Sequence, residues 1–263
     1  MSDTLLSFVL GVIQGLTEFL PISSSAHLLL PSLLFGLNDL GLSFDIAVHA
    51  GTLIAVVYYF RKEIALMFKS FFLSDENLLP HRNLAISLIV ATVPIVLAGL
   101  FVKDLIEQRI FNVEHIALAN IIFAGILLFA YLKRKDIKNL YSVTLYSALF
   151  VGVFQSLALL PGASRSGTAI TAALLLGFNL KDASKFSFML GIPTIFGALV
   201  LLLIEMQSTL EAFNYMNLII GFFISMIIAF LTIKLFLNFV ERIGMIPFVI
   251  YRIILGVFLI ILI

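Results

Sequence analysis

Apolar residues dominate the chain in ten segments separated by short polar or glycine- and proline-containing stretches. Eight of them are long enough, or nearly so, for a helix to cross the hydrocarbon core of a bilayer, which is about 30 Å thick. Two are too short, because their 11 to 13 residues extend only about 16 to 20 Å as a helix. The pattern predicts an all-α integral membrane protein. The segments lie at residues 5–20, 26–38 (short), 44–60, 83–101, 115–132, 142–160, 168–178 (short), 186–204, 215–239 and 246–263.

Each short segment follows a break in the helical sequence. The first break reads LPISSSAH from Leu20, and the second reads LPGASRSG from Leu160. Because proline, glycine and clustered serines continue a helix poorly, each break and its short segment predict a re-entrant helical hairpin. Lipid cannot satisfy the N–H and C=O groups of irregular backbone, so such backbone is buried in protein or lines a wet cavity. We therefore expect both breaks to line one polar site.

The two breaks belong to an internal repeat. We expect residues 1–263 to form one polytopic membrane domain of two repeats, 1–135 and 136–263, each with one re-entrant hairpin and three transmembrane helices. Three crossings are odd in number, so the second copy is inverted, an arrangement typical of transporters. At an offset of 141, Gly11, Val12, Gln14 and Leu16 face Gly152, Val153, Gln155 and Leu157; after a one-residue deletion, Pro21 and Ser24 face Pro161 and Ser164; further on, at an offset of 142, Phe44 and Thr52 face Phe186 and Thr194.

Basic residues between the segments predict the orientation. Loops assigned to alternate sides give one face twelve basic residues and the other only Lys103 and Arg109. The positive-inside rule makes the richer face cytoplasmic and puts both termini outside. The first hairpin then enters from outside and the second from the cytoplasm. The twelve are Arg61, Lys62, Lys69, Arg82, Lys133, Arg134, Lys135, Lys138, Lys181, Lys185, Lys234 and Arg242.

Composition excludes several classes of protein. With 62% apolar and 12% charged residues and a mean hydropathy of +1.16, the chain is not a water-soluble domain. A net charge of +1 leaves no polycationic surface, so we expect no nucleic-acid partner. The absence of cysteine from the sequence rules out disulfides, thiolate chemistry and sulfur-ligated metal.

The first break carries the residues of an acid, hydroxyl and imidazole set. Gln14 and Glu18 share one helix face because they are four residues apart. A carboxylate within the membrane is costly and is a functional candidate by default, although Glu18 also suits a cap of the bend. Ser23, Ser24 and Ser25 suit a helix N-terminus, and His27 follows them. Together they offer a base, a nucleophile and an orienting partner.

The second break supplies a cation. Arg165 lies between Ser164 and Ser166, flanked by Gly162 and Gly167. The arginine fork suits phosphate oxygens, and glycines admit backbone N–H groups to an anion at the start of a half-helix near Thr168. We expect an anion pocket that faces the acid, serine and histidine set. The alternative is that Arg165 only neutralises Glu18.

Five further polar residues lie inside predicted spans: Asp45, His49, Thr52, Lys234 and Arg252. Asp45 and His49 form another i, i+4 pair, near the start of a span where water also reaches. His49 is a minor candidate for catalysis. Arg252 is expected to neutralise Glu18 or Asp45, to contact a second phosphate, or to form a structural ion pair.

The motifs QGLTEFLPISSSAH and PGASRSG resemble the two defining motifs of the undecaprenyl-diphosphate phosphatase family, the bacitracin-resistance phosphatases of bacterial membranes. FDIAVHAGTLIAVV and IPFVIYR resemble it too, so the resemblance covers nearly the whole chain. Ala169 stands where the family has threonine, and Thr168 is one position early. The matching positions are Gln14, Glu18 and His27 for the first motif and Pro161, Gly162, Ser164, Arg165 and Ser166 for the second.

The resemblance implies hydrolysis of the terminal phosphate of undecaprenyl diphosphate at the outer face of the bacterial inner membrane. This activity recycles the lipid carrier of cell-wall synthesis and gives bacitracin resistance. It also implies a loosely held Mg²⁺ or Ca²⁺, for which Glu18 and, more weakly, Gln14 are the candidate ligands. The expected partners are the polyprenyl diphosphate and the bilayer. A homodimer is the candidate assembly.

Two mechanisms remain open at this stage. In both, Arg165, Ser164, Ser166, Gly162 and Thr168 hold phosphate oxygens. In one mechanism Ser24 attacks, with His27 or Glu18 as the base; in the other His27 attacks and Glu18 orients its ring. The alternative functions are a transporter or flippase of a polyprenyl phosphate or another anion, and a membrane scaffold without chemistry.

Overall fold

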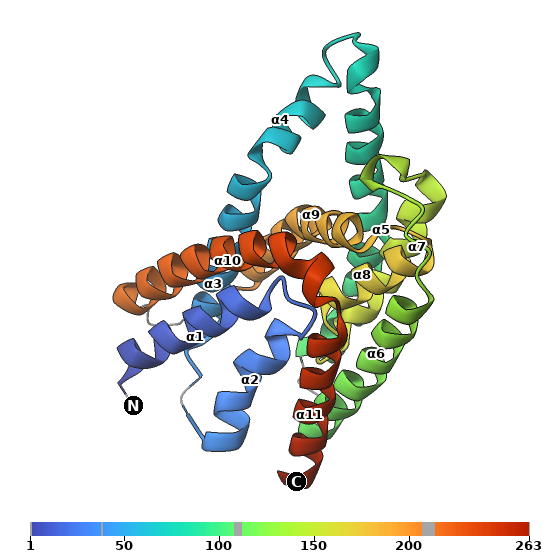
Figure 1. Ribbon diagram of the computed structural model, residues 1–263. Coiled ribbons are helices and arrows are strands. Elements are labelled where there is room, and N and C mark those ends of the chain that lie inside the picture. The colour runs from blue at the N-terminus through green and yellow to red at the C-terminus, as the bar shows by residue number, and fades with distance from the viewer. Residues whose placement is uncertain (1, 38, 108–111, 207–213, 263) are drawn as a thin grey trace.

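A computed structural model describes residues 2–37, 39–107, 112–206 and 214–262, and over these ranges the chain is helical and forms no strand (Figure 1). Three short 3₁₀ turns, Glu76–Leu78, Leu140–Ser142 and Leu157–Leu159, join the longer helices. The α-helices are α1 (Asp3–Thr17), α2 (Ser24–Phe35), α3 (Leu42–Tyr59), α4 (Arg61–Lys69), α5 (Leu79–Glu107), α6 (Val113–Lys133), α7 (Leu145–Ser156), α8 (Arg165–Leu175), α9 (Leu180–Met206), α10 (Tyr215–Ile243) and α11 (Ile246–Leu262).

The described residues confirm an all-helical protein with the length and hydrophobicity of an integral membrane protein. Five helices, α3, α5, α6, α9 and α10, are long and apolar enough to cross a membrane. Three shorter apolar helices, α1, α7 and α11, accompany them. α2 and α8 have 12 and 11 residues, as expected for the two short segments. α4 is an element that the sequence did not predict, separated from α3 by a bend at Phe60.

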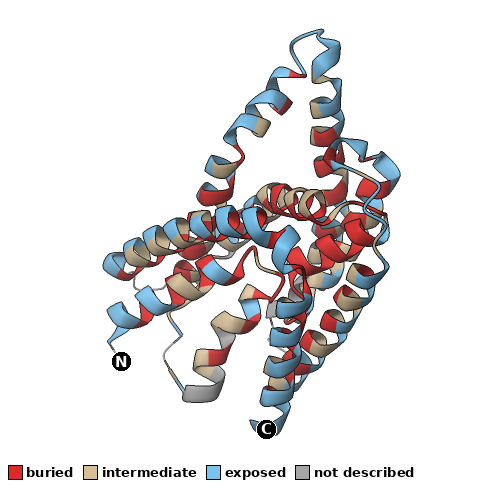
Figure 2. Ribbon diagram, viewed as in Figure 1, coloured by how far each residue is buried: buried red, intermediate tan, exposed pale blue. Residues whose placement is uncertain are grey.

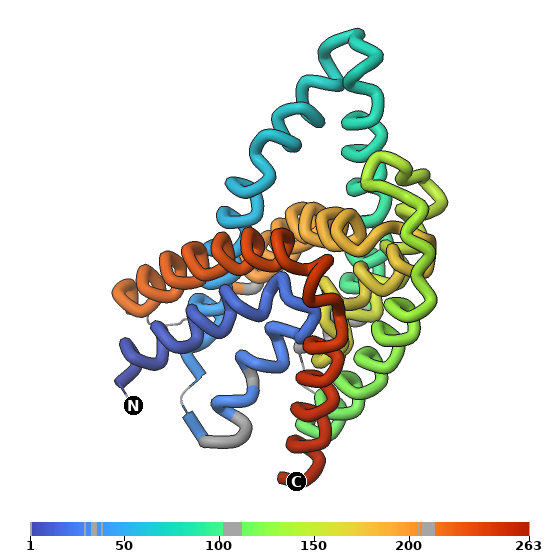
Figure 3. Tube along the Cα trace, viewed as in Figure 1, coloured from blue at the N-terminus to red at the C-terminus, as the bar shows by residue number. Residues whose placement is uncertain are grey.

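Helices from the two halves of the chain pack against each other. α1 lies along α10, α5 along α7, α6 along α11 and α3 along α9, so each pair joins an element of residues 1–135 to one of 136–263 (Figures 1 and 3). Glycines permit the first two contacts. A Cβ at Gly11 would lie 3.2 Å from the carbonyl oxygen of Gly221, and one at Gly152 would overlap the carbonyl oxygen of Ala91. Nine consecutive residues of α8, from Ser166 to Leu174, are buried.

Burial divides the molecule into a packed centre and apolar outer faces. Figure 2 shows buried residues gathered where α8 meets its neighbours and exposed residues along the outer faces of α10 and α11. Many exposed residues are large and apolar, for example Phe101, Phe129 and Ile254. An apolar surface this extensive is unfavourable in water and is expected where lipid covers it.

Candidate active site

Two bends that share the backbone conformation of one serine lie next to each other in the molecule. One joins α1 to α2 and the other joins α7 to α8. Ser23 (φ 72°, ψ 97°) and Ser164 (φ 72°, ψ 114°) each precede the first residue of a short helix, in a region of positive φ that non-glycine residues rarely adopt. The hydroxyl of Ser23 lies 3.3 Å from that of Ser25, and the hydroxyl of Ser164 lies 3.3 Å from that of Ser166.

This geometry corrects the predicted register of the repeat across the break. The backbone equivalent of Ser164 is Ser23, not Ser24, so the two breaks align at the offset of 141 without a deletion. The register was wrong because the alignment followed the prolines, Pro21 and Pro161, which lie at different places in the two bends. Arg165 therefore occupies the position equivalent to Ser24.

Arg252 ties the two bends together. Its side chain is fully buried, and its guanidinium donates to the carbonyl oxygens of Pro21 (3.4 Å), Gly162 (2.7 Å) and Ala163 (3.0 Å). These contacts satisfy backbone acceptors that the bends leave outside any helix. Among the described residues it makes no ion pair with Glu18 or Asp45, so the expectation that it neutralises a carboxylate was wrong.

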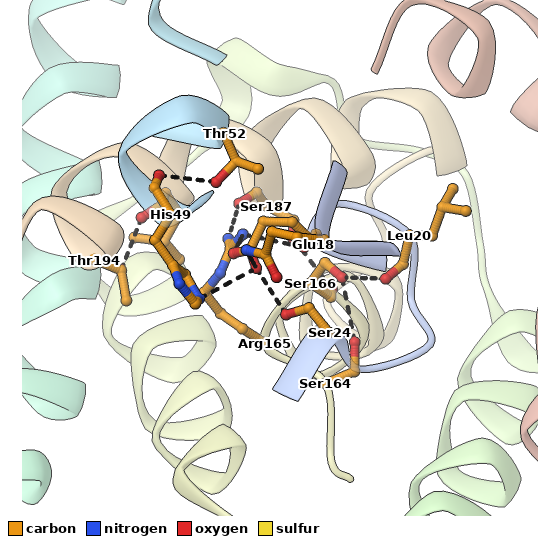
Figure 4. Close-up of polar contacts among 12 residues, drawn as sticks. Glu18, Leu20, Ser24, His49, Thr52, Ser164, Arg165, Ser166, Ser187 and Thr194 are labelled. Carbon is orange, nitrogen blue, oxygen red and sulfur yellow. Dashed lines mark hydrogen bonds and ion pairs between the residues drawn. The ribbon is translucent and has the colours of Figure 1, made fainter. Parts of the chain in front are cut away.

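Glu18 is the centre of the site (Figure 4). Its Oε2 accepts hydrogen bonds from the Ser24 hydroxyl (2.7 Å) and from the Gln14 amide (3.0 Å). Its Oε1 lies 3.1 Å from Nη2 of Arg165. The carboxylate side chain is only 6% exposed. The structure thus brings together Glu18, Ser24 and Arg165, the set that the Ser24 mechanism requires, with the Gln14 amide beside them.

α9 shapes the position of the Arg165 guanidinium. Nη1 donates to the carbonyl oxygen of Ser187 at 3.3 Å. One helical turn later, a Cβ at Gly191 would lie 2.5 to 3.0 Å from three atoms of the guanidinium. Only glycine leaves room for the arginine at this distance. Gly191 and Ser187 contact Arg165, and the sequence did not predict this because nothing in their local sequence signals a distant arginine.

The remaining residues of the second break are held by protein contacts. Ser164 accepts from the N–H of Gly167 (3.1 Å) and caps α8. The Ser166 hydroxyl donates to the carbonyl oxygen of Leu20 (2.9 Å), and that of Thr168 donates to the carbonyl oxygen of Arg165 (3.0 Å). Gly162 has φ +96°, and a Cβ there would lie 2.6 Å from the carbonyl oxygen of Ile116, on α6. In these contacts the four predicted phosphate ligands, Ser164, Ser166, Gly162 and Thr168, act as framework; their direct contact with phosphate stays a prediction.

His27 lies apart from the Glu18 cluster. Nδ1 is 2.6 Å from the carbonyl oxygen of Ser23, and Nε2 is 2.6 Å from the Tyr251 hydroxyl, whose ring stacks on the imidazole. Both ring nitrogens are therefore engaged. The expectation that Glu18 orients the His27 ring was wrong, because the sequence places these residues nine apart but cannot show which way α2 turns after the bend.

The imidazole near Glu18 belongs to His49, on α3. Its Nε2 lies 3.9 Å from Oε2 of Glu18, and its Nδ1 lies 2.7 Å from the carbonyl oxygen of Asp45. A cavity of about 180 Å³ borders His49, Ser25 and Asp45 among its lining residues. The i, i+4 spacing of Asp45 and His49 was the available sequence signal.

The residues around Glu18 do not fit a resident divalent cation. Each Glu18 oxygen is already engaged, one of them by a guanidinium whose positive charge opposes a second cation. Oε1 of Gln14 is buried without a hydrogen-bond partner, but so is Oε1 of Gln155 at the equivalent place in the second half. Within the described ranges no three His, Cys, Asp or Glu residues gather as a metal site.

The fold and this site define a helical membrane protein with a buried carboxylate, serine and arginine cluster at two bent half-helices. Comparison with known families matches residues 7–258 to "Bacitracin resistance protein BacA", and the chain belongs to that family. It is 47% identical over 258 residues to "Undecaprenyl-diphosphatase" of Saccharophagus degradans, covering 97% of this chain and 96% of the relative. It is 44% identical over 255 residues to "Undecaprenyl-diphosphatase 1" of Pseudoalteromonas translucida, covering 96% of each chain.

Proposed function

We propose that this protein hydrolyses undecaprenyl diphosphate to undecaprenyl phosphate and inorganic phosphate. The observation that carries the proposal is the 2.7 Å hydrogen bond from the Ser24 hydroxyl to Glu18, with the Arg165 guanidinium 3.1 Å from the same carboxylate. A hydroxyl beside a base and a fixed cation is the set that phosphoryl transfer requires. The two relatives named undecaprenyl-diphosphatase support the substrate.

Ser24 is the proposed nucleophile. Its hydroxyl already donates to Glu18, which serves as the first proton acceptor, whereas both nitrogens of His27 are engaged elsewhere. Ser24 is also the first residue of α2, and the Ser23 side chain does not cap that helix. The partial positive charge at the N-terminus of α2 is therefore directed at the place where a phosphoryl group would lie.

Arg165 is the proposed phosphate-binding residue. Its fork spans Glu18 on one side and the Ser187 carbonyl on the other, so a phosphate that reaches Ser24 meets a guanidinium that is already positioned. Mg²⁺ or Ca²⁺, which the family resemblance implies, would supply charge neutralisation to the diphosphate, and the residues around Glu18 are not proposed to hold it.

The membrane arrangement is proposed to be an inverted repeat with two re-entrant hairpins, α1–α2 and α7–α8. The matching bends at Ser23 and Ser164 and the cross-packing of the two halves support it. We place the protein in the bacterial inner membrane with both termini outside and the site open to the periplasm. Of the two basic residues expected on that side, Arg109 lies outside the described residues.

Cysteine labelling tests this orientation in a chain that has no cysteine of its own. Lys135→Cys and Glu114→Cys lie at exposed positions on opposite predicted sides. In intact cells an impermeant thiol reagent is expected to label the second variant and not the first. The reverse pattern would overturn the orientation and the periplasmic site.

Phosphate release by the purified full chain in detergent tests the function. We expect turnover of undecaprenyl diphosphate by the native protein and none by Ser24→Ala. The transporter alternative predicts no turnover in detergent, because transport needs a sealed membrane, and in that outcome the phosphatase proposal fails. The homodimer stays a prediction.

A further inference from the structure

His49 is the imidazole that the fold places next to the reacting groups. It comes from α3, 31 residues after Glu18 in sequence, and its Nε2 faces Oε2 of Glu18 at 3.9 Å. In Figure 4 the His49 ring points toward the Glu18 and Arg165 side chains. His27, the histidine singled out by the sequence, has both nitrogens bound to Ser23 and Tyr251 instead.

The hydrogen-bond partners of His49 define which nitrogen can accept a proton. Nδ1 lies 2.7 Å from the carbonyl oxygen of Asp45, which only accepts, so this nitrogen carries the hydrogen. In the neutral ring Nε2 is then free of hydrogen and faces Glu18. The imidazole is thus oriented as a base, and the backbone fixes its tautomer.

Oε2 of Glu18 lies between the serine and this base. The same oxygen accepts the Ser24 hydroxyl at 2.7 Å and faces Nε2 of His49 at 3.9 Å. A gap of 3.9 Å is too long for a hydrogen bond. A bridging water or a small closure with substrate bound would connect the two groups, since such contacts commonly tighten in the substrate complex.

The His49 side chain is more exposed than that of Glu18. Its side chain is 26% exposed, compared with 6% for Glu18, and it borders the cavity of about 180 Å³ between α1, α2 and α3. A proton that reaches His49 can therefore leave the site, whereas one left on Glu18 would remove the charge that pairs with Arg165.

We propose that His49 accepts the proton of Ser24 through Glu18 and returns it in the second half of the reaction, an inference that rests on the proposed phosphatase function. In the first step the Ser24 Oγ–P bond forms and the bridging P–O bond breaks, with its electron pair leaving on undecaprenyl phosphate. The hydroxyl proton passes to Oε2 of Glu18 and on to Nε2 of His49.

In the second step a water attacks phosphorus, and the Ser24 Oγ–P bond breaks. His49 returns the Ser24 proton through Glu18 to the leaving Oγ. One proton of the water stays on inorganic phosphate, which leaves, and the other is released to solvent. The sum is undecaprenyl diphosphate plus water giving undecaprenyl phosphate plus phosphate. His49 acts through Glu18 and does not need to contact the substrate.

Kinetics of His49→Gln and His49→Ala test the proposal, with His81→Gln as the matched control. His81 is in the first turns of α5, where its ring packs edge-on against Tyr141, away from the Glu18 cluster. Both His49 variants are expected to lose about 10²-fold or more in kcat with little change in KM, and His81→Gln is expected to keep the native values. Thermal midpoints in detergent report folding.

Chemical rescue separates proton transfer from a structural role. Free imidazole is expected to raise the kcat of His49→Ala at least tenfold, because the substitution enlarges the cavity that borders position 49 and admits the imidazole. It is expected to leave the kcat of Ser24→Ala unchanged. A His49→Gln enzyme with native kcat, or a folded His49→Ala enzyme that imidazole does not rescue, overturns the relay while the phosphatase function stands. Native protein that releases no phosphate overturns the function itself.

Discussion

The bend before α2 and the bend before α8 match at one residue, since Ser23 and Ser164 are both at φ 72° and each hydroxyl lies 3.3 Å from that of the serine two residues on. They differ just before it, where Gly162 at φ +96° stands in place of Pro21. Their side chains are used differently. Ser164 caps α8, and α8 is buried along most of its length. Ser23 does not cap α2, and the residues that follow it, Ser24 and Ser25, are half-buried and exposed.

The two bends therefore contribute differently to the site. The α8 bend, closed by its own hydrogen bonds, holds a single reactive group, Arg165, at a fixed place. The α2 bend leaves its helix N-terminus and its hydroxyls available, next to the Glu18 carboxylate. The α8 bend fixes its reactive group, and the α2 bend leaves its groups accessible. Together they supply groups that are positioned before the substrate arrives, as catalysis requires.

The comparison is tested most strongly by the serines that the two bends use differently. Ser24→Ala is expected to lower turnover by at least about 10³-fold, as loss of a nucleophile does, while lipid diphosphate binding persists. Ser164→Ala is expected to keep most of the turnover and to lose about 1 kcal/mol of stability with its helix cap. Phosphate release and thermal unfolding in detergent measure both.

Equal loss of turnover in the two serine variants would show that both bends contact phosphate. Trapping the intermediate adds a chemical check on the same point. An acid-stable phospho-adduct mapped to Ser24 supports this nucleophile, and an acid-labile, base-stable adduct on His27 contradicts it.

The second prediction concerns the one reactive side chain of the α8 bend. Arg165→Lys is expected to lose about 10²-fold in turnover, close to the loss in Arg165→Ala, because an ammonium cannot bridge Glu18 and phosphate with a planar fork. Steady-state phosphate release measures it. A lysine enzyme that keeps most of its activity would mean that charge alone is needed here.

Much of the fold was predictable because it follows from hydrophobic length. The ten apolar segments correspond to helices α1, α2, α3 and α5 to α11, and the break motifs fell at the two bends. α4 escaped prediction, because its charged residues gave it no apolar segment. The predicted alignment of the two bends was wrong by one residue. It paired the prolines, whereas the matching backbone conformation is at Ser23 and Ser164.

The two sequence motifs predicted those residues of the candidate site that lie within the motifs. Glu18, Ser24 and Arg165 meet as expected. Closeness in sequence to Glu18 favoured His27, whereas helix packing brings His49, on α3, nearer to that carboxylate. The part that either histidine takes in catalysis stays a prediction. Gly191 and Arg252 act through contacts with residues far away in the chain, which local patterns do not encode.

The third prediction tests how tightly the second half fixes Arg165. Gly191→Ala is expected to displace the guanidinium and lower turnover by about 10- to 10²-fold, the scale of an ångström-sized misplacement. Gly197→Ala is the matched control on the same helix, where a Cβ meets nothing within 4 Å. If both variants keep native turnover, the cradle on α9 does not set the position of Arg165.

The smallest expected effect separates the two buried glutamines. Gln14 donates to Glu18 at 3.0 Å, whereas its counterpart Gln155 donates to Thr194 at 3.2 Å, and each leaves its Oε1 without a partner. Gln14→Glu places a second carboxylate against Glu18, and two adjacent carboxylates repel each other. Because a divalent cation relieves this repulsion, the variant is expected to bind Mg²⁺ or Ca²⁺ several-fold more tightly. It is expected to remain active. Gln155→Glu has no carboxylate beside it among the contacts described and is expected to leave the divalent titration unchanged. The apparent affinity from phosphate release at increasing metal concentration compares the two, and an equal response would remove the special position of Gln14 beside the reacting carboxylate.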